Sequence, residues 1–212
     1  MQETMLQNRK PVIRSYWLVG ACIAVGFVAS ICIGNYPISV REIISILTGG
    51  EVSALTRKVF FTLRLPRTCM GVMAGAGLGV AGSVYQMIFR NPLASPDIIG
   101  VSSGANLGAA IAIVSVGIGV GGIALGAFAG GLLAVAFVML LVRATRANTT
   151  ATYVLAGIVI NAASKSLITV LKYFADPDNE LAAMEYWEMG TFGNVTTSKV
   201  LSILPLFAVG LI

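Results

Sequence analysis

A polar stripe runs along one face of an otherwise apolar segment of the sequence. Residues 151–174 are predominantly apolar and are interrupted by Asn161, Lys165, Thr169 and Lys172. At 100° per residue these four side chains fall within about 80° of one another on a helix. A lysine in the middle of such a run either extends its amine toward water or pairs with a negatively charged group. Lys165 is therefore the side chain of this sequence whose chemistry most needs an explanation.

The side chains that usually carry out catalysis are missing or isolated. The sequence has no histidine, which is the commonest metal ligand and general base. It has no GxxxxGK[ST] string, the loop that binds nucleotide phosphates, and its three cysteines lie in or beside apolar runs without metal-type spacing. We therefore expect a chain that is not an enzyme, binds no metal or cofactor, and does not hydrolyse ATP itself.

The composition places the chain in a membrane. Hydrophobic residues make up 57% of the sequence and charged residues only 11%, against roughly 25% charged residues in ordinary soluble domains. The net charge of +5 comes from cations scattered around the apolar runs. Lipid headgroups and protein partners explain this distribution better than nucleic acid does.

The apolar runs predict an all-α, polytopic bundle of transmembrane helices that forms a single domain over residues 1–212. A helix rises 1.5 Å per residue, so about 20 residues cross the hydrocarbon core. The segment between Asp97 and Arg143 would reach roughly 65 Å as one helix, so it must turn, and the glycine cluster 117–122 suits the reversal. The predicted spans are about 16–34, 67–88, 98–116, 123–142, 151–174 and 199–212.

Glycines four residues apart predict flat helix faces where another backbone can approach closely. The predicted packing glycines are Gly71, Gly75 and Gly79 in the second span, and Gly100, Gly104 and Gly108 in the third. Outside the spans we expect a short helix over residues 40–47, capped by Ser39, with Ile43, Ile44 and Leu47 on one side. A second short helix is expected over 181–189, with Trp187 at the membrane interface.

Charge counts alone do not fix the orientation of the chain. With the N-terminus inside, the short loops that carry Arg90, Arg143 and Arg146 are cytoplasmic, as the positive-inside tendency favours. Seven of the nine acids then lie outside. The exception is a basic cluster on the outer side, formed by Arg57, Lys58, Arg64 and Arg67.

Several motifs resemble one family of membrane proteins. These motifs are R-L-P-R from Arg64, then Gln86, then R-N-P-L-A-x-P-D-I-I-G-V-S-S-G-A from Arg90, and later L-A-G from Leu155 and Y-W-E-M-G from Tyr186. In this order they resemble the FecCD-type permeases of bacterial ABC importers for iron-siderophores, haem and vitamin B12. Members of that family are usually about half as long again, with ten spans, so the resemblance implies that this sequence is an N-terminal portion.

The resemblance implies three functional sites. Arg64 and Arg67 would meet acidic residues of a binding protein, although lipid phosphates could also bind them. Asn91, Leu93, Thr149 and Thr150 would form a cytoplasmic gate, although Pro92 and Asn91 also suit a plain turn. Asn161, Lys165 and Thr169 would line the translocation path and suit an anionic cargo. Snorkelling and helix–helix hydrogen bonds remain the alternative for this stripe.

The family also implies partners and a location. We expect a second permease copy or paralogue, two ATP-binding subunits that use the ATP, an extracytoplasmic substrate-binding protein and the lipid of a bacterial cytoplasmic membrane. An ion-gradient-driven secondary transporter is the alternative, but the apolar runs lack the acid that it would need. A purely structural membrane scaffold is the third possibility. The chelate that is carried cannot be read from the sequence.

Overall fold

The computed structural model describes residues 9–92, 94–117, 119–147 and 149–211. Within these ranges the chain is helical and contains no strand. It forms two compact units: Met1–Gly75 together with Phe192–Ile212, and Ala76–Thr191. We refer to them as unit 1 and unit 2 and describe each by itself.

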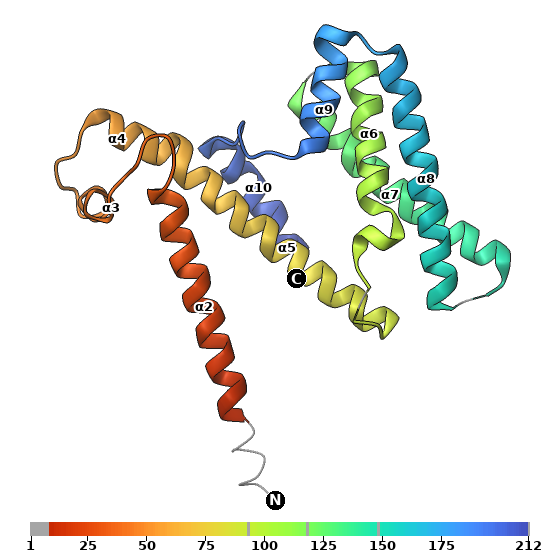
Figure 1. The fold of residues 1–212 in the computed structure, drawn as a ribbon, viewed down its shortest axis with the longest axis horizontal. Coiled ribbons are helices and arrows are strands. Elements are labelled where there is room, and N and C mark those ends of the chain that lie inside the picture. Colours follow the sequence, from red (N-terminus) through yellow and green to blue (C-terminus); the bar gives the residue numbers. More distant parts are fainter. Residues whose placement is uncertain (1–8, 93, 118, 148, 212) are drawn as a thin grey trace, which may run out of the picture. The chain divides into compact units, whose positions relative to one another are not determined.

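Unit 1 joins α2 (Arg9–Cys32) and α3 (Val40–Leu47) to a long continuous helix. That helix comprises α4 (Ala54–Val59), a π-helical turn (Phe60–Arg64) and the first part of α5 (Leu65–Phe89). α10 (Thr197–Gly210) also belongs to unit 1 (Figure 1). Its core consists of Ile31, Ile38, Ile46 and Phe60.

The helix that enters α5 begins earlier than the sequence predicted. We expected it to start at about residue 67, but the structure is helical from Ala54. Pro66 does not end the helix, although proline lacks an N–H and its ring crowds the carbonyl four residues earlier. The π-helical turn lies directly ahead of Pro66, and the Leu65 N–H bonds to the Phe60 carbonyl five residues back. This wider turn accommodates the proline ring within a continuous helix.

Unit 2 begins in α5 and continues through a 3-10 segment (Pro96–Ile99), α6 (Val101–Val116), α7 (Val120–Thr145) and α8 (Thr150–Phe174). A second π-helical turn (Pro177–Leu181) then leads into the short α9 (Ala182–Met189). α6, α7 and α8 pack side by side, and α9 lies against α6 (Figure 1). The core of this unit includes Ala109, Ile113, Ile123, Ile168 and Met184.

Glycines bring α6 and α7 together. A Cβ added to Gly104 would collide with the Gly130 carbonyl oxygen and with Ala134. A Cβ on Gly108 would collide with Gly126 in the same way. The backbones therefore approach more closely than any larger residue allows, which is the packing that small residues favour in membranes.

The lengths of the helices fit several membrane crossings. Within the described residues, four helical segments are long and apolar enough to span a membrane: Arg14–Cys32, Ala54–Phe89, Gly121–Thr145 and Thr150–Phe174. The other two predicted spans correspond to shorter apolar helices, Val101–Val116 and Thr197–Gly210. The reversal expected at 117–122 is present, because α6 ends at Gly117 with a φ of 90° and α7 begins at Val120.

Candidate functional site

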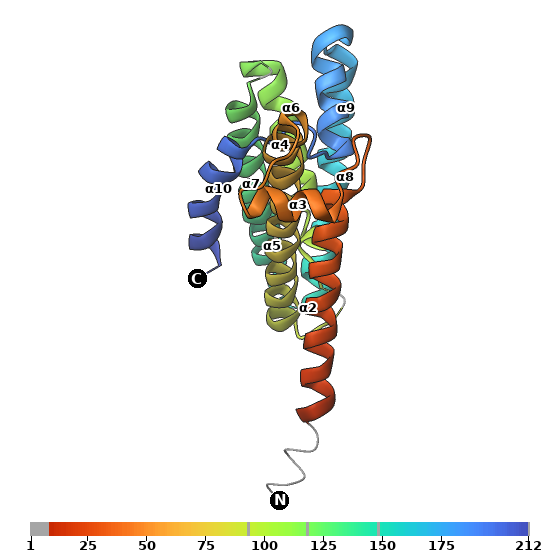
Figure 2. The same ribbon diagram turned by 90° about the vertical axis from the view of Figure 1, so that its left-hand side faces the viewer.

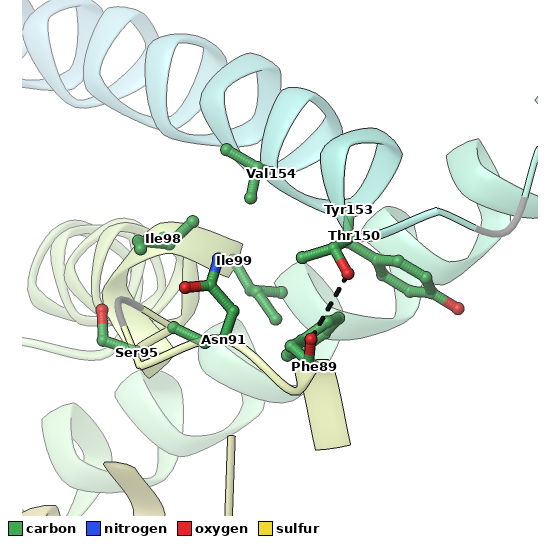
Figure 3. A pocket seen from close by; sticks show the side chains of 9 residues that line it. Phe89, Asn91, Ser95, Ile98, Ile99, Thr150, Tyr153 and Val154 are labelled. Carbon is green, nitrogen blue, oxygen red and sulfur yellow. Dashed lines mark hydrogen bonds between the residues drawn. The ribbon is translucent and has the colours of Figure 1, made fainter. Parts of the chain in front are cut away.

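A pocket of about 230 Å³ forms where the turn after α5 meets the beginning of α8. Asn91 and Thr150, two of the predicted gate residues, both line it. Figure 3 shows the Asn91 side chain between the 3-10 segment and α8, with Phe89 and Tyr153 beside Thr150. The structure thus brings together residues that are 59 positions apart (91 to 150) in the sequence.

Backbone hydrogen bonds hold the turn that carries Asn91. Arg90 ends the helical path with a φ of 48°, and its N–H donates to the Met87 carbonyl at 3.3 Å. The Asn91 N–H donates to Gln86 at 3.2 Å. On the other side of the pocket, the Thr150 hydroxyl donates to the Phe89 carbonyl at 3.5 Å (Figure 3). The end of α5 and the start of α8 are therefore linked at the pocket.

The other two predicted gate residues are placed differently. The Thr149 hydroxyl caps α8 by accepting a hydrogen bond from the Thr152 N–H at 3.3 Å, and the residue is exposed. It does not line the pocket. Leu93 lies outside the described residues. The gate role of all four residues stays a prediction.

A second, more polar pocket of about 450 Å³ lies along the C-terminal half of α8. The predicted path residues Lys165 and Thr169 line it together with Lys172 from the same helix. The other polar side chains that line it are Ser103 and Asn106 of α6 and Glu188 of α9. Three of the four residues of the polar stripe therefore line one open pocket.

The two lysines of this pocket have different surroundings. The Lys172 amine binds the carboxylates of Glu185 and Glu188, both at 2.7 Å. In the part of the chain that the structure describes, the Lys165 amine has neither an ion pair nor a hydrogen bond. α9 is also held by Trp187, whose indole N–H donates to the Asn106 amide oxygen at 3.2 Å. Lys165 is thus the cation of the pocket that can take up a further negative charge.

Asn161 does not join the other residues of the stripe. Its amide N–H donates to the Asp97 backbone carbonyl at 3.4 Å, and its amide oxygen is buried without a partner among the described residues. The Asp97 carboxylate accepts a hydrogen bond from the Ser102 hydroxyl. Asn161 therefore supports the turn before α6, whereas the polar pocket begins at Lys165.

The two arginines of R-L-P-R bind backbone carbonyls within unit 1. The Arg64 guanidinium donates to the Ile33 carbonyl at 2.5 Å and to the Tyr36 carbonyl at 3.1 Å. Arg67 donates to the Gly193 carbonyl at 2.7 Å. Arg64 thus caps the end of α2, and a Cβ at Gly34 would collide with its guanidinium. Arg67 is exposed and secures the segment before α10.

The predicted packing glycines fall into three groups. Gly104 and Gly108 make the close contact with α7 described above. Gly100, with a φ of 87°, lies where a Cβ would be 3.2 Å from the Asn161 amide oxygen. A Cβ on Gly71, Gly75 or Gly79 would meet nothing within 4 Å among the described residues.

Four residues of this region were not predicted as site residues: Ser103, Asn106 and Glu188, which line the polar pocket, and Glu185, which pairs with Lys172. Ser103 and Asn106 are three residues apart in an apolar helix, so they share a face, and this spacing was an available signal. Glu185 and Glu188 could be recognised only once α9 was placed against α8. Among the described residues no cluster of three or more His, Cys, Asp or Glu could hold a metal ion.

The side chains along α8 offer hydrogen bonds and positive charge to a polar molecule. Hydroxyl, amide and ammonium groups line one cavity on α8, and a narrower, mostly apolar pocket lies at the other end of the same helix. The polar groups can exchange hydrogen bonds with a passing molecule.

Known proteins resemble this chain over most of its length. It is 31% identical to the ferric enterobactin transport system permease protein FepG of Escherichia coli, over 97% of this chain and 61% of that protein. It is 34% identical to the molybdate import system permease protein MolB of Haemophilus influenzae, over 82% of this chain and 52% of that protein.

A solved structure shares the fold. It is described as a metal-chelate type ABC transporter in an inward-facing conformation, with a TM-score of 0.76 and 28% sequence identity. The match covers 92% of this chain and 59% of the solved one. The chain thus spans about half to three fifths of the length of these relatives. The FecCD transport family matches residues 5–212, and the chain belongs to that family.

Proposed function

We propose that this chain is part of the membrane permease of an ABC importer that carries an anionic metal chelate, of the iron-siderophore class, across a bacterial cytoplasmic membrane. The family match over residues 5–212 is the observation that carries the proposal. The chain itself makes a conduit. A separate pair of ATP-binding subunits hydrolyses ATP, and an extracytoplasmic binding protein delivers the cargo. A second permease copy or paralogue completes the path.

The two pockets of α8 support a path along this helix. With the N-terminus inside, the Thr150 end of α8 faces the cytoplasm and the Lys172 end faces outward. Cargo would then first meet the polar pocket with the unpaired Lys165 amine, and later the narrower pocket at Asn91 and Thr150. ATP binding and hydrolysis would shift the permease between states in which one end or the other is open.

The nature of the polar pocket supports an anionic cargo. Lys172 is already paired with two carboxylates, whereas the Lys165 amine has no partner among the described residues. An unpaired ammonium within a membrane span is costly unless an anion or water solvates it. A chelate that carries carboxylate or phenolate groups would supply that negative charge during passage.

Reconstituted transport tests the proposal. The full-length permease, its ATP-binding subunits and its binding protein would be placed in proteoliposomes and offered radiolabelled ferric enterobactin, haemin, molybdate and cobalamin in turn. We expect uptake of a ferric chelate that requires both ATP and the binding protein. Uptake that instead follows an imposed proton or sodium gradient, without ATP, would establish the secondary-transporter alternative.

A further inference from the structure

α3 has an unusual place in unit 1. Figure 2 shows it lying across the end of α2, and Figure 1, turned by 90°, views it nearly along its own axis. The two views agree that α3 runs roughly perpendicular to α2 and to the α4–α5 helix. Because α2 is long and apolar enough to span a membrane, a helix perpendicular to it lies parallel to the membrane plane.

Several contacts fix α3 at the level of the last turn of α2. The Ile38 N–H donates to the Cys32 carbonyl at 3.1 Å, which closes the connection between the two helices. Ile46 of α3 shares one core with Ile31 of α2 and with Phe60. A capping box fixes the start of α3, since Ser39 and Glu42 bond to each other's backbone N–H groups. α3 is therefore held where a membrane span leaves the hydrocarbon.

The apolar side of α3 is wider than the surface that it buries. Ile46 is buried and Ile43 is half-buried against unit 1. On the adjoining face, Val40, Ile44 and Leu47 are 53%, 57% and 72% exposed. Of the three residues expected on one side of this helix, Ile43 is half-buried, whereas Ile44 and Leu47 are exposed. The spacing of 40, 44 and 47 places these three along one continuous strip.

Free cations accompany the exposed apolar strip. Arg41 is exposed and follows Val40 directly, and Arg57 and Lys58 are exposed on the neighbouring α4. Among the described residues, none of these three side chains makes an ion pair or a hydrogen bond, unlike those of Arg64 and Arg67. An exposed apolar strip with basic residues beside it, parallel to the membrane plane, has the chemistry of a helix that lies in a lipid interface.

We propose that α3 is an interfacial membrane anchor. Val40, Ile44 and Leu47 insert between the lipid acyl chains at the outer surface, and Arg41 reaches the phosphates, with Arg57 and Lys58 close to the headgroups. This short helix outside the predicted spans thereby fixes the depth of the first two spans. The inference depends on α2 spanning the membrane and not on the identity of any cargo.

Collision accessibility of spin labels tests this inference directly. In the full-length permease with Cys22→Ala, Cys32→Ala and Cys69→Ala, single nitroxides would be attached through Ile44→Cys or Leu47→Cys. Glu51→Cys, in the exposed loop after α3, is the matched control. The protein would be held in nanodiscs of phosphatidylcholine and phosphatidylglycerol. Molecular oxygen, which enters the bilayer, and a nickel chelate, which stays in water, serve as the relaxing agents.

We expect oxygen to relax the labels at 44 and 47 more strongly than the nickel chelate does, and the reverse at 51. Arg41→Glu should increase relaxation of the label at 44 by the nickel chelate relative to relaxation by oxygen. Arg41→Lys should leave this ratio unchanged. Nickel access at 44 and 47 equal to that at 51 would place the strip in water and overturn the proposal. Protection of both labels from both agents would also overturn it, because protein would then cover the strip. If one of the two cysteine variants fails to assemble, the label at the other position still tests the proposal.

Discussion

Basic residues in the two units of this chain are used in opposite ways. In unit 1, Arg64 and Arg67 donate to backbone carbonyls of their own unit. In unit 2, Lys165 lines a polar pocket without a partner in the described chain, although Lys172, two turns along the same helix, is paired with two glutamates. Arg64 and Arg67 therefore stabilise the fold of unit 1, whereas the amine of Lys165 has no partner among the described residues of unit 2.

This difference between paired and unpaired cations shows that charge in a membrane segment does not by itself indicate a binding site. An arginine can satisfy the unpaired carbonyls at the end of a helix and then has fewer donors for a partner. A lysine whose acidic neighbours are already paired with another cation still needs an anion or water to solvate its charge.

The largest effect should come from removing the Arg64 cap. Arg64→Met loses two hydrogen bonds from a charged donor to the Ile33 and Tyr36 carbonyls. Hydrogen bonds to charged groups contribute about 1.5–3 kcal/mol each when they are shielded, and less where water competes. We expect a clear loss of thermal stability of the permease in nanodiscs.

Arg57→Met is the control for this loss, because Arg57 is exposed in α4 and its side chain makes no hydrogen bond or ion pair with the described residues. Its thermal midpoint should match that of the wild type. Equal midpoints for Arg64→Met and Arg57→Met would show that the Arg64 contacts contribute nothing, and the contrast between the two units would fail.

Arg67 offers a cleaner test of binding-protein docking than Arg64 does. Replacing both arginines by glutamate would also disturb the end of α2, so a loss of docking could not be assigned. Arg67 is exposed, and we predict that Arg67→Glu weakens association with the binding protein about tenfold, or about 1.4 kcal/mol. A titration of the binding protein against permease in nanodiscs measures this, and the effect should grow at low salt.

Arg67→Lys keeps the charge but loses the planar guanidinium that pairs bidentately with carboxylates. Its affinity for the binding protein should therefore lie between those of the wild type and Arg67→Glu. An unchanged affinity for Arg67→Glu would leave lipid phosphate and the Gly193 carbonyl as the partners of this arginine.

Lys165→Met should slow cargo uptake by about fivefold, or roughly 1 kcal/mol, while assembly and stability stay intact. Methionine keeps much of the volume of the lysine stem but carries no charge to attract an anion. Lys165→Arg should retain most of the rate. A rate for Lys165→Met within about twofold of the wild type would favour the snorkelling interpretation, in which the amine only reaches for water.

The smallest effect concerns pH and α3. The Ser39 backbone N–H and hydroxyl donate to the Glu42 carboxylate and hold its pKa below the ordinary value of 4.5. Because the folded-state pKa is lowered, this stabilisation is complete above pH 4.5 and is lost as the pH falls through the lowered pKa. Amide hydrogen exchange across residues 40–47, corrected for the intrinsic pH dependence, should lose protection on acidification.

Glu42→Gln removes the titrating group but can keep the hydrogen bond to Ser39, as glutamine serves in capping boxes. Protection of α3 in this variant should no longer depend on pH through this site. An identical acid response in Glu42→Gln and the wild type would assign the titration to another group.

Most of the helices could be predicted from the sequence, because a long apolar run can adopt few structures other than a helix in a membrane. It also placed the cap of α3 at Ser39 and the reversal after Gly117, since both rest on local chemistry. It placed the start of the α5 helix too late, because the π-helical turn that accommodates Pro66 has no signature in hydropathy.

The candidate site was predictable only in part. A helical projection groups Asn161 with Lys165, but it cannot show that the 3-10 segment brings the Asp97 carbonyl to Asn161. It likewise cannot distinguish Lys165 from Lys172, because α9 supplies the glutamates that pair with only one of them. The same limit applies to glycine spacing, since Gly104 and Gly75 stand in similar patterns but only Gly104 meets a neighbouring backbone.

Chemical access to position 165 shows whether this side chain faces an aqueous path. Lys165→Cys, in the cysteine-free permease assembled with its partners in proteoliposomes, would be treated with a negatively charged, membrane-impermeant methanethiosulfonate. The account predicts that the thiol reacts from water, and that the rate changes when ATP and the cargo-loaded binding protein are added together. Failure to react in every state, while a cysteine at the exposed Lys58 reacts readily, would place residue 165 outside any aqueous path and contradict the account.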